Sequence, residues 1–187
     1  MNKLRVGICG WGNVATGLFK TLQTNSVEIK KRSNLEIEII AIGARRDNPK
    51  CDPGNVIIER DIFKIIDHDI DVIVELIGGV DVARDLILKA LNAKKHVVTA
   101  NKAVIFNHGD ELFSVANRNG VKLLYESSVC AGTPIIKLLN QELAASKISK
   151  ISGMLNGTSN FILSNMEEGM EFEPTLKLAQ EKGYAEP

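Results

Sequence analysis

Short runs of β-branched apolar residues alternate along the chain with longer stretches in which apolar residues recur at helical spacing. The runs predict strands at Leu4–Cys9, Leu35–Gly43, Asn55–Ile58, Asp71–Ile77, His96–Thr99 and Val121–Ser127. The stretches between them predict helices at Asn13–Lys31, Val80–Ala93 and Asp110–Asn119. Because the strands are almost continuously apolar, we expect an α/β fold with a doubly wound parallel sheet that is covered by helices on both faces.

The pattern changes after Pro134. From there the chain predicts, in order, a helix at Ile135–Ala145, a strand near Lys147–Leu155, a turn at Gly157–Asn160, a helix from about Phe161 and a helix at Pro174–Lys182. Gly183 suits the left-handed residue that follows a helix. We therefore expect two domains, 1–133 and 134–187, with the second ending before any domain closure.

Composition and charge narrow the class of protein. Hydrophobic residues make up 44% and charged residues 25%, and 23 Lys+Arg balance 23 Asp+Glu, so no net field attracts nucleic acid or an anionic membrane. No apolar run approaches the roughly 18–20 residues that span a bilayer, and Met1–Val6 lacks the apolar stretch of a signal peptide. Cys9, Cys51 and Cys130 form no CxxC pair, which indicates reduced thiols in a cytoplasm. We expect neither a nucleic-acid nor a membrane partner.

A glycine-rich string, Gly10–Ala15, joins the first strand to the first helix and fits the pattern G-x-G-x-x-G/A. Gly10 permits the tight turn, Gly12 allows the backbone to approach a pyrophosphate, and the small Ala15 lets helix and strand pack closely. The free N–H groups of the helix then face the phosphates. In this context the string predicts a dinucleotide site, and a tight turn without a ligand is the alternative.

The end of the second strand bears on which dinucleotide is bound. Sites that prefer NAD usually place an acidic residue there to bind the ribose 2′-hydroxyl. Here the strand is followed by Arg45 and Arg46, whose guanidinium groups suit a phosphate. The sequence therefore predicts NADP, with Arg45 or Arg46 on the 2′-phosphate, and a solvated basic loop is the alternative.

Further strings carry a more specific resemblance. They are Asp71–Gly79, His96–Ala103, Tyr125–Pro134, Leu155–Leu163 and Gly183–Pro187. In this order and over essentially the whole chain, they resemble homoserine dehydrogenase. The resemblance implies a Rossmann-type NAD(P)-binding fold followed by the beginning of an α+β substrate and dimerisation domain. It implies a cytoplasmic oxidoreductase that interconverts L-homoserine and L-aspartate 4-semialdehyde with NADPH or NADH, in threonine and methionine biosynthesis, as a homodimer or homotetramer.

The resemblance also assigns residues. It implies cofactor contacts at Asn13, Val14, Ile77, Gly78, Asn101, Lys102 and Gly183, which add to Gly10, Gly12, Ala15, Arg45 and Arg46 from the glycine string and the end of the second strand. Lys102 is the implied catalytic residue, whose ammonium can stabilise an alkoxide and help to deliver a proton. The implied substrate contacts are Thr158, Tyr184 and Glu186, and the implied ligands of a monovalent cation such as sodium are Glu126, Val129, Ala131 and Thr133. Cys130 and Ala131 stand where the family often has glycines.

Other interpretations stay open. The family's second catalytic lysine and its aspartate follow the Gly-Tyr-x-Glu-Pro string, so we expect these 187 residues to bind cofactor but to turn over little. Aspartate and diaminopimelate dehydrogenases share the glycine turn, and a non-catalytic NADP-binding module is a third reading. Trp11, the only tryptophan, is assigned no role.

Overall fold

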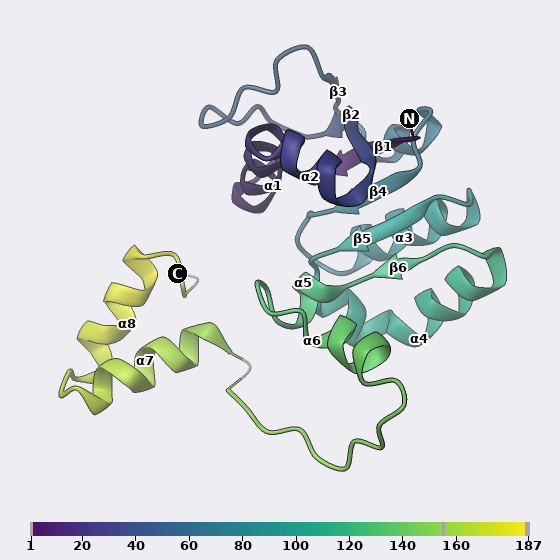
Figure 1. Cartoon of the computed structure of the whole chain (residues 1–187). Coiled ribbons are helices and arrows are strands. Elements are labelled where there is room, and N and C mark those ends of the chain that lie inside the picture. The colour runs from purple at the N-terminus through teal and green to yellow at the C-terminus, as the bar shows by residue number, and fades with distance from the viewer. Residues whose placement is uncertain (1, 155, 186–187) are drawn as a thin grey trace. The chain divides into compact units, whose positions relative to one another are not determined.

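The computed structural model describes residues 2–154 and 156–185. The chain divides into two compact units, Met1–Gly132 and Thr133–Pro187 (Figure 1). Each unit is described by itself below. Among the described residues, no helix is both long enough and apolar enough to pass through a membrane.

The first unit is built on a parallel sheet of six strands in the order β3-β2-β1-β4-β5-β6 (Figure 1). The strands are β1 Asn2–Cys9, β2 Leu35–Gly43, β3 Ile57–Glu59, β4 Val72–Glu75, β5 His96–Thr99 and β6 Leu123–Leu124. The bounds of β2 and β5 are those that the sequence predicts. The order reverses direction at β1, so that β1 and β4 lie side by side at the switch point where doubly wound sheets bind ligands.

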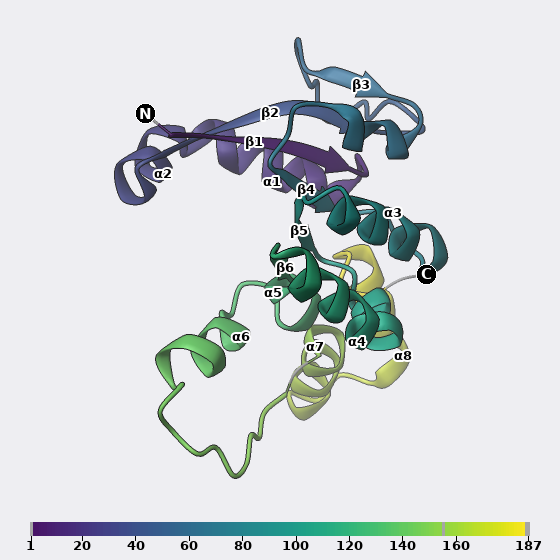
Figure 2. The same ribbon diagram turned by 90° about the vertical axis from the view of Figure 1, so that its right-hand side faces the viewer.

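Helices cover both faces of this sheet. They are α1 Asn13–Thr24, α2 Ser26–Ser33, the 3₁₀ helix η1 Ile62–Asp67, α3 Asp81–Asn92, α4 Lys102–Asn119 and the single turn α5 Glu126–Val129. Figure 2 shows α3 and α4 beside the β4–β6 half of the sheet. The alternation along β4 explains the two layers, because Val72 and Val74 pack in the core with α1, whereas Ile73 packs in the core with α3 and α4.

Two helices of the first unit differ markedly from the sequence prediction. The single helix expected at Asn13–Lys31 is wrong, since Asn25 ends α1 and α2 begins at Ser26. Asn and Ser side chains compete for backbone hydrogen bonds and favour helix ends over helix interiors, which accounts for the break. The helix expected at Asp110–Asn119 instead begins at Lys102, because the Asn101 side chain accepts a hydrogen bond from the N–H of Val104 and caps it.

The strand predictions after β2 are also corrected in part. The third strand lies at Ile57–Glu59 rather than Asn55–Ile58, and β4 is shorter than the predicted Asp71–Ile77. The strand expected at Val121–Ser127 is confined to β6. After it, the chain folds into α5, where the buried Ser128 hydroxyl donates to the Thr99 carbonyl at 2.8 Å. That bond holds the segment against the end of β5.

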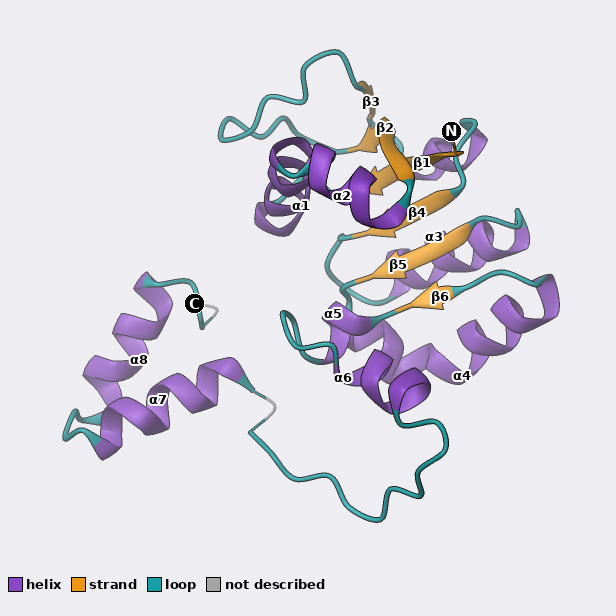
Figure 3. Ribbon diagram, viewed as in Figure 1, coloured by secondary structure: helices purple, strands orange, loops and turns teal. Residues whose placement is uncertain are grey.

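The regular elements of the second unit, within the described residues, are all helices (Figure 3). Its elements are α6 Ile135–Lys137, the π-helical turn η2 Leu138–Glu142, α7 Gly157–Glu167 and α8 Phe172–Glu181. The strand expected near Lys147–Leu155 is wrong, since residues 147–154 are irregular. A strand needs a neighbouring strand for its backbone groups, and all the paired strands of the described residues lie in the first unit. Leu155 lies outside the described residues.

Two glycines delimit the helices of the second unit. The turn expected at Gly157–Asn160 is wrong, because the Asn156 side chain accepts from the N–H of Ser159 at 2.8 Å and begins α7 at Gly157. Gly183, after α8, has a φ of 75°, which confirms the predicted left-handed residue.

Candidate functional site

Five strands of the sheet end level with one another. The register pairs Cys9 with Gly43 and with Glu75, Gly43 with Glu59, and Glu75 with Thr99. We call this edge of the sheet the carboxyl rim. The loops that leave it carry the glycine turn, the two arginines, the Ile77–Gly78 pair and Lys102, so the fold brings these predicted residues to one edge.

The turn at Gly10 requires glycine. Its φ is 103°, and its N–H donates to the Gly43 carbonyl at 2.8 Å, which continues the ladder beyond the end of β1. A Cβ at this position would lie 2.6 Å from the Leu76 carbonyl oxygen, in a backbone that cannot move aside. The close approach of the loops after β1 and β4 therefore depends on this residue.

Helix α1 begins without a side-chain cap. Gly12 is the N-cap residue, no side chain accepts a capping hydrogen bond from the first-turn N–H groups, and that turn contains no acidic residue. A Cβ on Gly12 would meet nothing within 4 Å, so packing within the described chain does not require glycine here. Asn13 and Val14 are exposed at the first helical positions, whereas Ala15 is fully buried against the sheet. The N–H groups at this end are therefore free of a side-chain cap and can donate hydrogen bonds to an anion.

A cleft of about 760 Å³ opens at the carboxyl rim, within the size range of pockets that hold small ligands. Of the predicted cofactor residues, Gly10, Arg45, Arg46, Ile77 and Gly78 line it. The other predicted residues do not line it, although Asn101 and Lys102 follow β5 at the same rim.

The arginines after β2 are available to a ligand. Arg45 and Arg46 are exposed, and neither has an ion-pair partner among residues 2–154 and 156–185. Arg60 is a third guanidinium in the cleft that the sequence analysis did not single out. It donates to the Ala44 carbonyl at 3.2 Å and to Asp47 Oδ1 at 2.6 Å, so it already braces the loop that carries the other two.

Trp11, to which the sequence analysis assigned no role, has a structural role in the fold. Its side chain is buried, and its ring meets that of Phe19 edge to face, with 5.2 Å between centroids. Asn48 donates to the Trp11 carbonyl at 3.0 Å and to the Thr16 hydroxyl at 2.9 Å. Trp11 and Asn48 thus fix the glycine turn to the loop after β2, a role that no sequence pattern indicates.

Lys102 is the first residue of α4, directly after the Asn101 cap. Asn101 donates from its side chain to the Gly79 carbonyl at 2.7 Å, and its own N–H donates to the Thr99 hydroxyl at 2.9 Å. The Lys102 side chain is exposed. A cation at the amino end of a helix opposes the helix dipole, so this position is not explained by helix stability.

The predicted cation ligands follow one another along the chain. Glu126 and Val129 bound α5, and the Glu126 carbonyl accepts from the N–H of Cys130 at 3.2 Å. Ala131 lies in the exposed turn before Gly132, and Thr133 is the first residue of the second unit. Within the described residues, no group of three or more His, Cys, Asp or Glu side chains could hold a metal ion.

In the second unit, Thr158 and Tyr184 lie together. The Thr158 hydroxyl donates to the Tyr184 carbonyl, and the Tyr184 ring lies 5.0 Å from that of Phe161. Gly183 precedes Tyr184 in the turn after α8. Glu186 lies outside the described residues.

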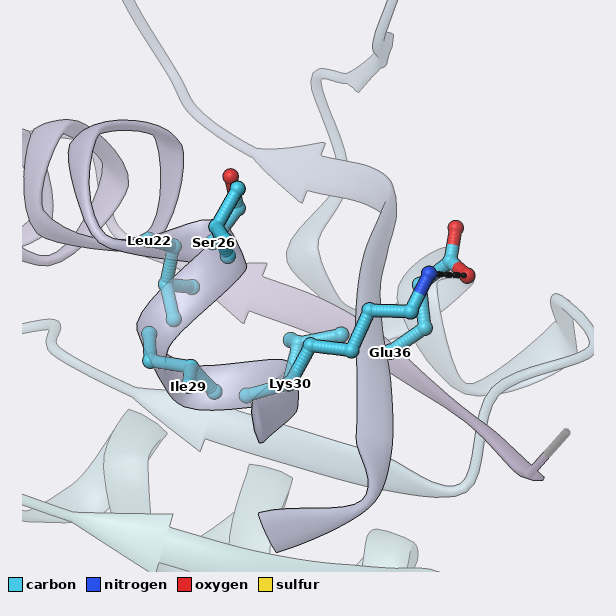
Figure 4. A pocket seen from close by; sticks show the side chains of 7 residues that line it. Leu22, Ser26, Ile29, Lys30 and Glu36 are labelled. Carbon is cyan, nitrogen blue, oxygen red and sulfur yellow. Dashed lines mark hydrogen bonds and ion pairs between the residues drawn. The ribbon is translucent and has the colours of Figure 1, made fainter. Parts of the chain in front are cut away.

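A smaller cavity of about 200 Å³ lies between α1, α2 and the start of β2 (Figure 4). It is lined by Leu22, Ser26 and Ile29 of α1 and α2, and by the Lys30–Glu36 ion pair, whose atoms are 3.4 Å apart. Glu36 lies near the start of β2, whereas the rim is at its end. None of the predicted site residues contributes to this cavity.

Comparison with known proteins gives consistent matches. Residues 10–126 match the family model described as homoserine dehydrogenase, NAD binding domain, and residues 134–187 match the model described as homoserine dehydrogenase. Homoserine dehydrogenase of Pseudomonas aeruginosa is 48% identical over 188 residues, and that of Neisseria gonorrhoeae is 40% identical over 190 residues. The chain spans 43% of the length of each of these two relatives and is covered completely.

Solved structures match as well. A homoserine dehydrogenase from Thiobacillus denitrificans superposes with a TM-score of 0.91 and 41% identity, covering 100% of this chain and 44% of that one. A hyperthermophilic archaeal homoserine dehydrogenase in complex with NADPH has a TM-score of 0.80 and 26% identity, covering 98% of this chain and 62% of that one. The sheet and its flanking helices are therefore those of a Rossmann-type fold.

Proposed function

Because the chain belongs to the homoserine dehydrogenase family, we propose that its first unit, 1–133 in the sequence prediction, binds NADP(H) in the cleft at the carboxyl rim. The observation that carries this proposal is the Gly10 turn, which no residue with a side chain can replace without a clash, at the base of the cleft. Gly12, Asn13, Val14 and Ala15 form the uncapped start of α1, which suits the pyrophosphate.

A preference for NADP over NAD is supported by the loop after β2. Arg45 and Arg46 are exposed, lack ion-pair partners in the described ranges and line the cleft, where a 2′-phosphate can accept two charge-assisted hydrogen bonds. An archaeal structure that this chain resembles contains NADPH. Calorimetric titration of the chain with NADP and with NAD tests the proposal, and equal or tighter binding of NAD would contradict it.

The reaction proposed for the whole protein is the interconversion of L-homoserine and L-aspartate 4-semialdehyde. The nicotinamide ring, when bound, accepts or supplies the hydride. Ile77 and Gly78 would support the cofactor beside β4, and Asn101 would orient the start of α4. The Lys102 ammonium, at the same rim, would stabilise the alkoxide that an aldehyde becomes and hold the proton that neutralises it.

We extend the proposal to the second unit, residues 134–187, as part of the substrate domain. Thr158, Tyr184 and Glu186 would contact the substrate, with Gly183 near the cofactor; the Thr158–Tyr184 hydrogen bond supports a shared location for two of them. The 187 residues span 43% of the Pseudomonas relative, so we expect them to bind nucleotide but to oxidise homoserine slowly or not at all. A spectrophotometric assay of the purified chain decides this, since near-full turnover would contradict it.

Two further parts of the proposal rest on the resemblance. A monovalent cation such as sodium would be held by backbone oxygens of Glu126, Val129, Ala131 and Thr133, since hard cations prefer oxygen donors. Titration with sodium in a sodium-free buffer, followed by nucleotide affinity, tests this. We also propose a cytoplasmic homodimer or homotetramer, which light scattering of the whole protein would check.

A further inference from the structure

Glu75, the last residue of β4, is an acid buried inside the sheet. Its side chain has no exposed surface, and in the register it lies between Cys9 of β1 and Thr99 of β5. The residues before it are Val72, Ile73 and Val74, all buried and apolar. Burying an ionisable group at the end of such a strand costs free energy unless hydrogen bonds or an opposite charge compensate it.

Both oxygens of the Glu75 carboxylate are used. Oε1 accepts from the N–H of Ile77 at 2.8 Å, and Oε2 accepts from the Thr99 hydroxyl. The Thr99 oxygen in turn accepts from the N–H of Asn101 at 2.9 Å. The Ile77 N–H and the Thr99 hydroxyl thus both donate toward the Glu75 side chain, and Asn101 is joined to it through Thr99.

These donors belong to two different loops. Ile77 is in the loop after β4, which lines the cleft, and Asn101 is in the loop after β5, which begins α4 at Lys102. A second link joins the same loops, since the Asn101 side chain donates to the Gly79 carbonyl at 2.7 Å. Glu75 therefore connects the loop after β4, which carries Ile77, to the loop after β5, which carries Asn101 and Lys102.

The buried carboxylate is costly for the fold. Burial raises the pKa of Glu75 above its ordinary value, while the hydrogen bonds from Thr99, Ile77 and Asn101 oppose that rise. The facing titratable group is the Cys9 thiol on β1, whose pKa is raised to about 12 by burial and by Glu75, so it remains neutral at physiological pH. A strand end made only for stability would carry a neutral side chain here.

We propose that Glu75 is a positioning residue, which holds the Ile77–Gly79 loop and the Asn101–Lys102 loop in one arrangement at the nicotinamide end of the cleft. This inference rests on the proposed nucleotide binding and deepens it. The adenosine end, where Arg45 and Arg46 lie, follows β2, on the other side of β1 in the strand order, and neither arginine is bonded to Glu75, so we expect contacts at that end to be independent of Glu75.

Glu75→Gln tests the inference with little change of shape. A glutamine must turn its amide NH₂ toward either the Ile77 N–H or the Thr99 hydroxyl, so one donor loses its acceptor. We expect the affinity for NADPH to fall about tenfold. Adenosine 2′,5′-bisphosphate, which can occupy only the adenosine end, should bind the variant and the wild-type chain alike.

Two substitutions of Thr99 and a matched control complete the design. Thr99→Val removes the hydroxyl that links Glu75 to Asn101 and should repeat the loss, whereas Thr99→Ser keeps the hydroxyl and should restore NADPH affinity. Glu111→Gln makes the same chemical change at an exposed carboxylate paired with Arg84 and should have no effect on either ligand.

The possible outcomes distinguish a failure of the positioning role of Glu75 from a failure of the proposed NADP(H) binding. A selective loss of NADPH affinity in Glu75→Gln and Thr99→Val, with Thr99→Ser restored, supports the positioning role. Equal losses for both ligands, or unchanged NADPH affinity in the folded variants, overturn it. A wild-type chain that binds neither ligand contradicts the proposed function itself, and the inference falls with it.

Discussion

The two ends of β4 carry carboxyl groups in opposite situations. Asp71, just before the strand, accepts hydrogen bonds from Arg5 at 2.8 Å from the backbone N–H, 3.1 Å from Nε and 2.7 Å from Nη2. The hydrogen bond from the Arg5 side chain is the main reason why the pKa of Asp71 is lowered to about 2. Glu75, four residues later, has no cationic partner among the described residues, and burial raises its pKa.

The directions of the two pKa shifts give these carboxyl groups opposite effects on stability. A carboxyl whose pKa is lowered on folding stabilises the fold at neutral pH, whereas one whose pKa is raised costs stability there. The amino end of the sheet is thus where ionic interactions secure the fold. The carboxyl rim tolerates a destabilising acid, a glycine with positive φ and an uncapped helix, which are features of a functional site.

The largest effect is expected at the glycine turn. Gly10→Ala places a Cβ 2.6 Å from the Leu76 carbonyl oxygen at a φ of 103°, and we expect the free energy of unfolding to fall by about 2–4 kcal/mol. Urea denaturation followed by circular dichroism measures this. Gly17→Ala in α1, where a Cβ meets nothing within 4 Å, should instead stabilise by about 0.5–1 kcal/mol. Equal effects of the two changes would contradict the role of the turn.

The arginines give the next largest effect, on affinity rather than on stability. The double variant Arg45→Ala with Arg46→Ala should weaken NADP binding by roughly one to two orders of magnitude, because charge-assisted hydrogen bonds to the 2′-phosphate are lost. NAD binding should stay unchanged in the same calorimetric titrations. Arg32→Ala on α2 removes an exposed charge that lines no part of the cleft and is the control. A matching loss of NAD affinity would show that the loop is damaged rather than selective.

At the amino end, Asp71→Asn should lower the free energy of unfolding by about 1–2 kcal/mol at pH 7. In the wild-type chain, this stabilisation is complete above the ordinary pKa of 3.8 and is lost as the pH falls toward about 2. The urea midpoints of the variant and the wild type should therefore converge on acidification. Asp110→Asn, an exposed acid in α4, should show no such difference, and parallel curves for Asp71→Asn would argue against the Arg5 interaction as the cause.

The smallest effect on stability is expected at Gly12. Gly12→Ser adds a side-chain cap to α1 without a clash and should stabilise the chain by a few tenths of a kcal/mol, as Ser exceeds Gly only slightly as an N-cap. The new hydroxyl would occupy an N–H group that we propose for the pyrophosphate, so NADP affinity should fall. Thermal unfolding and calorimetry together measure both effects, and a stabilised variant with full affinity would contradict the assignment of α1.

Much of the sheet follows from the sequence. The bounds of β2 and β5 agree with the apolar runs, because a parallel strand buried on both faces has a continuous hydrophobic signal. The Gly10–Ala15 string and the Arg45–Arg46 pair lie at the rim as their positions after β1 and β2 predict. The place of these residues along the carboxyl rim can therefore be predicted from the strand that each of them follows in the chain.

The contacts beneath the rim are not readable in this way. Glu75 looks like the polar end of an apolar run, and only the fold brings it to Thr99 and Ile77. The one available signal was an acid directly after three buried β-branched residues. Trp11 and Asn48 meet across 37 positions of sequence, which no periodicity encodes. For residues 147–154 the sequence predicted a strand that the structure does not contain. An apolar alternation forms a strand only where a partner strand can accept and donate its backbone hydrogen bonds.

The burial of Trp11 has a practical consequence. It is the only tryptophan of the chain, and it lies at the base of the glycine turn on the wall of the cleft. Its ultraviolet emission therefore comes from one known place, free of background from other indoles. A reduced nicotinamide nearby would quench that light by energy transfer, and loosening of the turn would shift its colour, so the protein contains its own optical reporter.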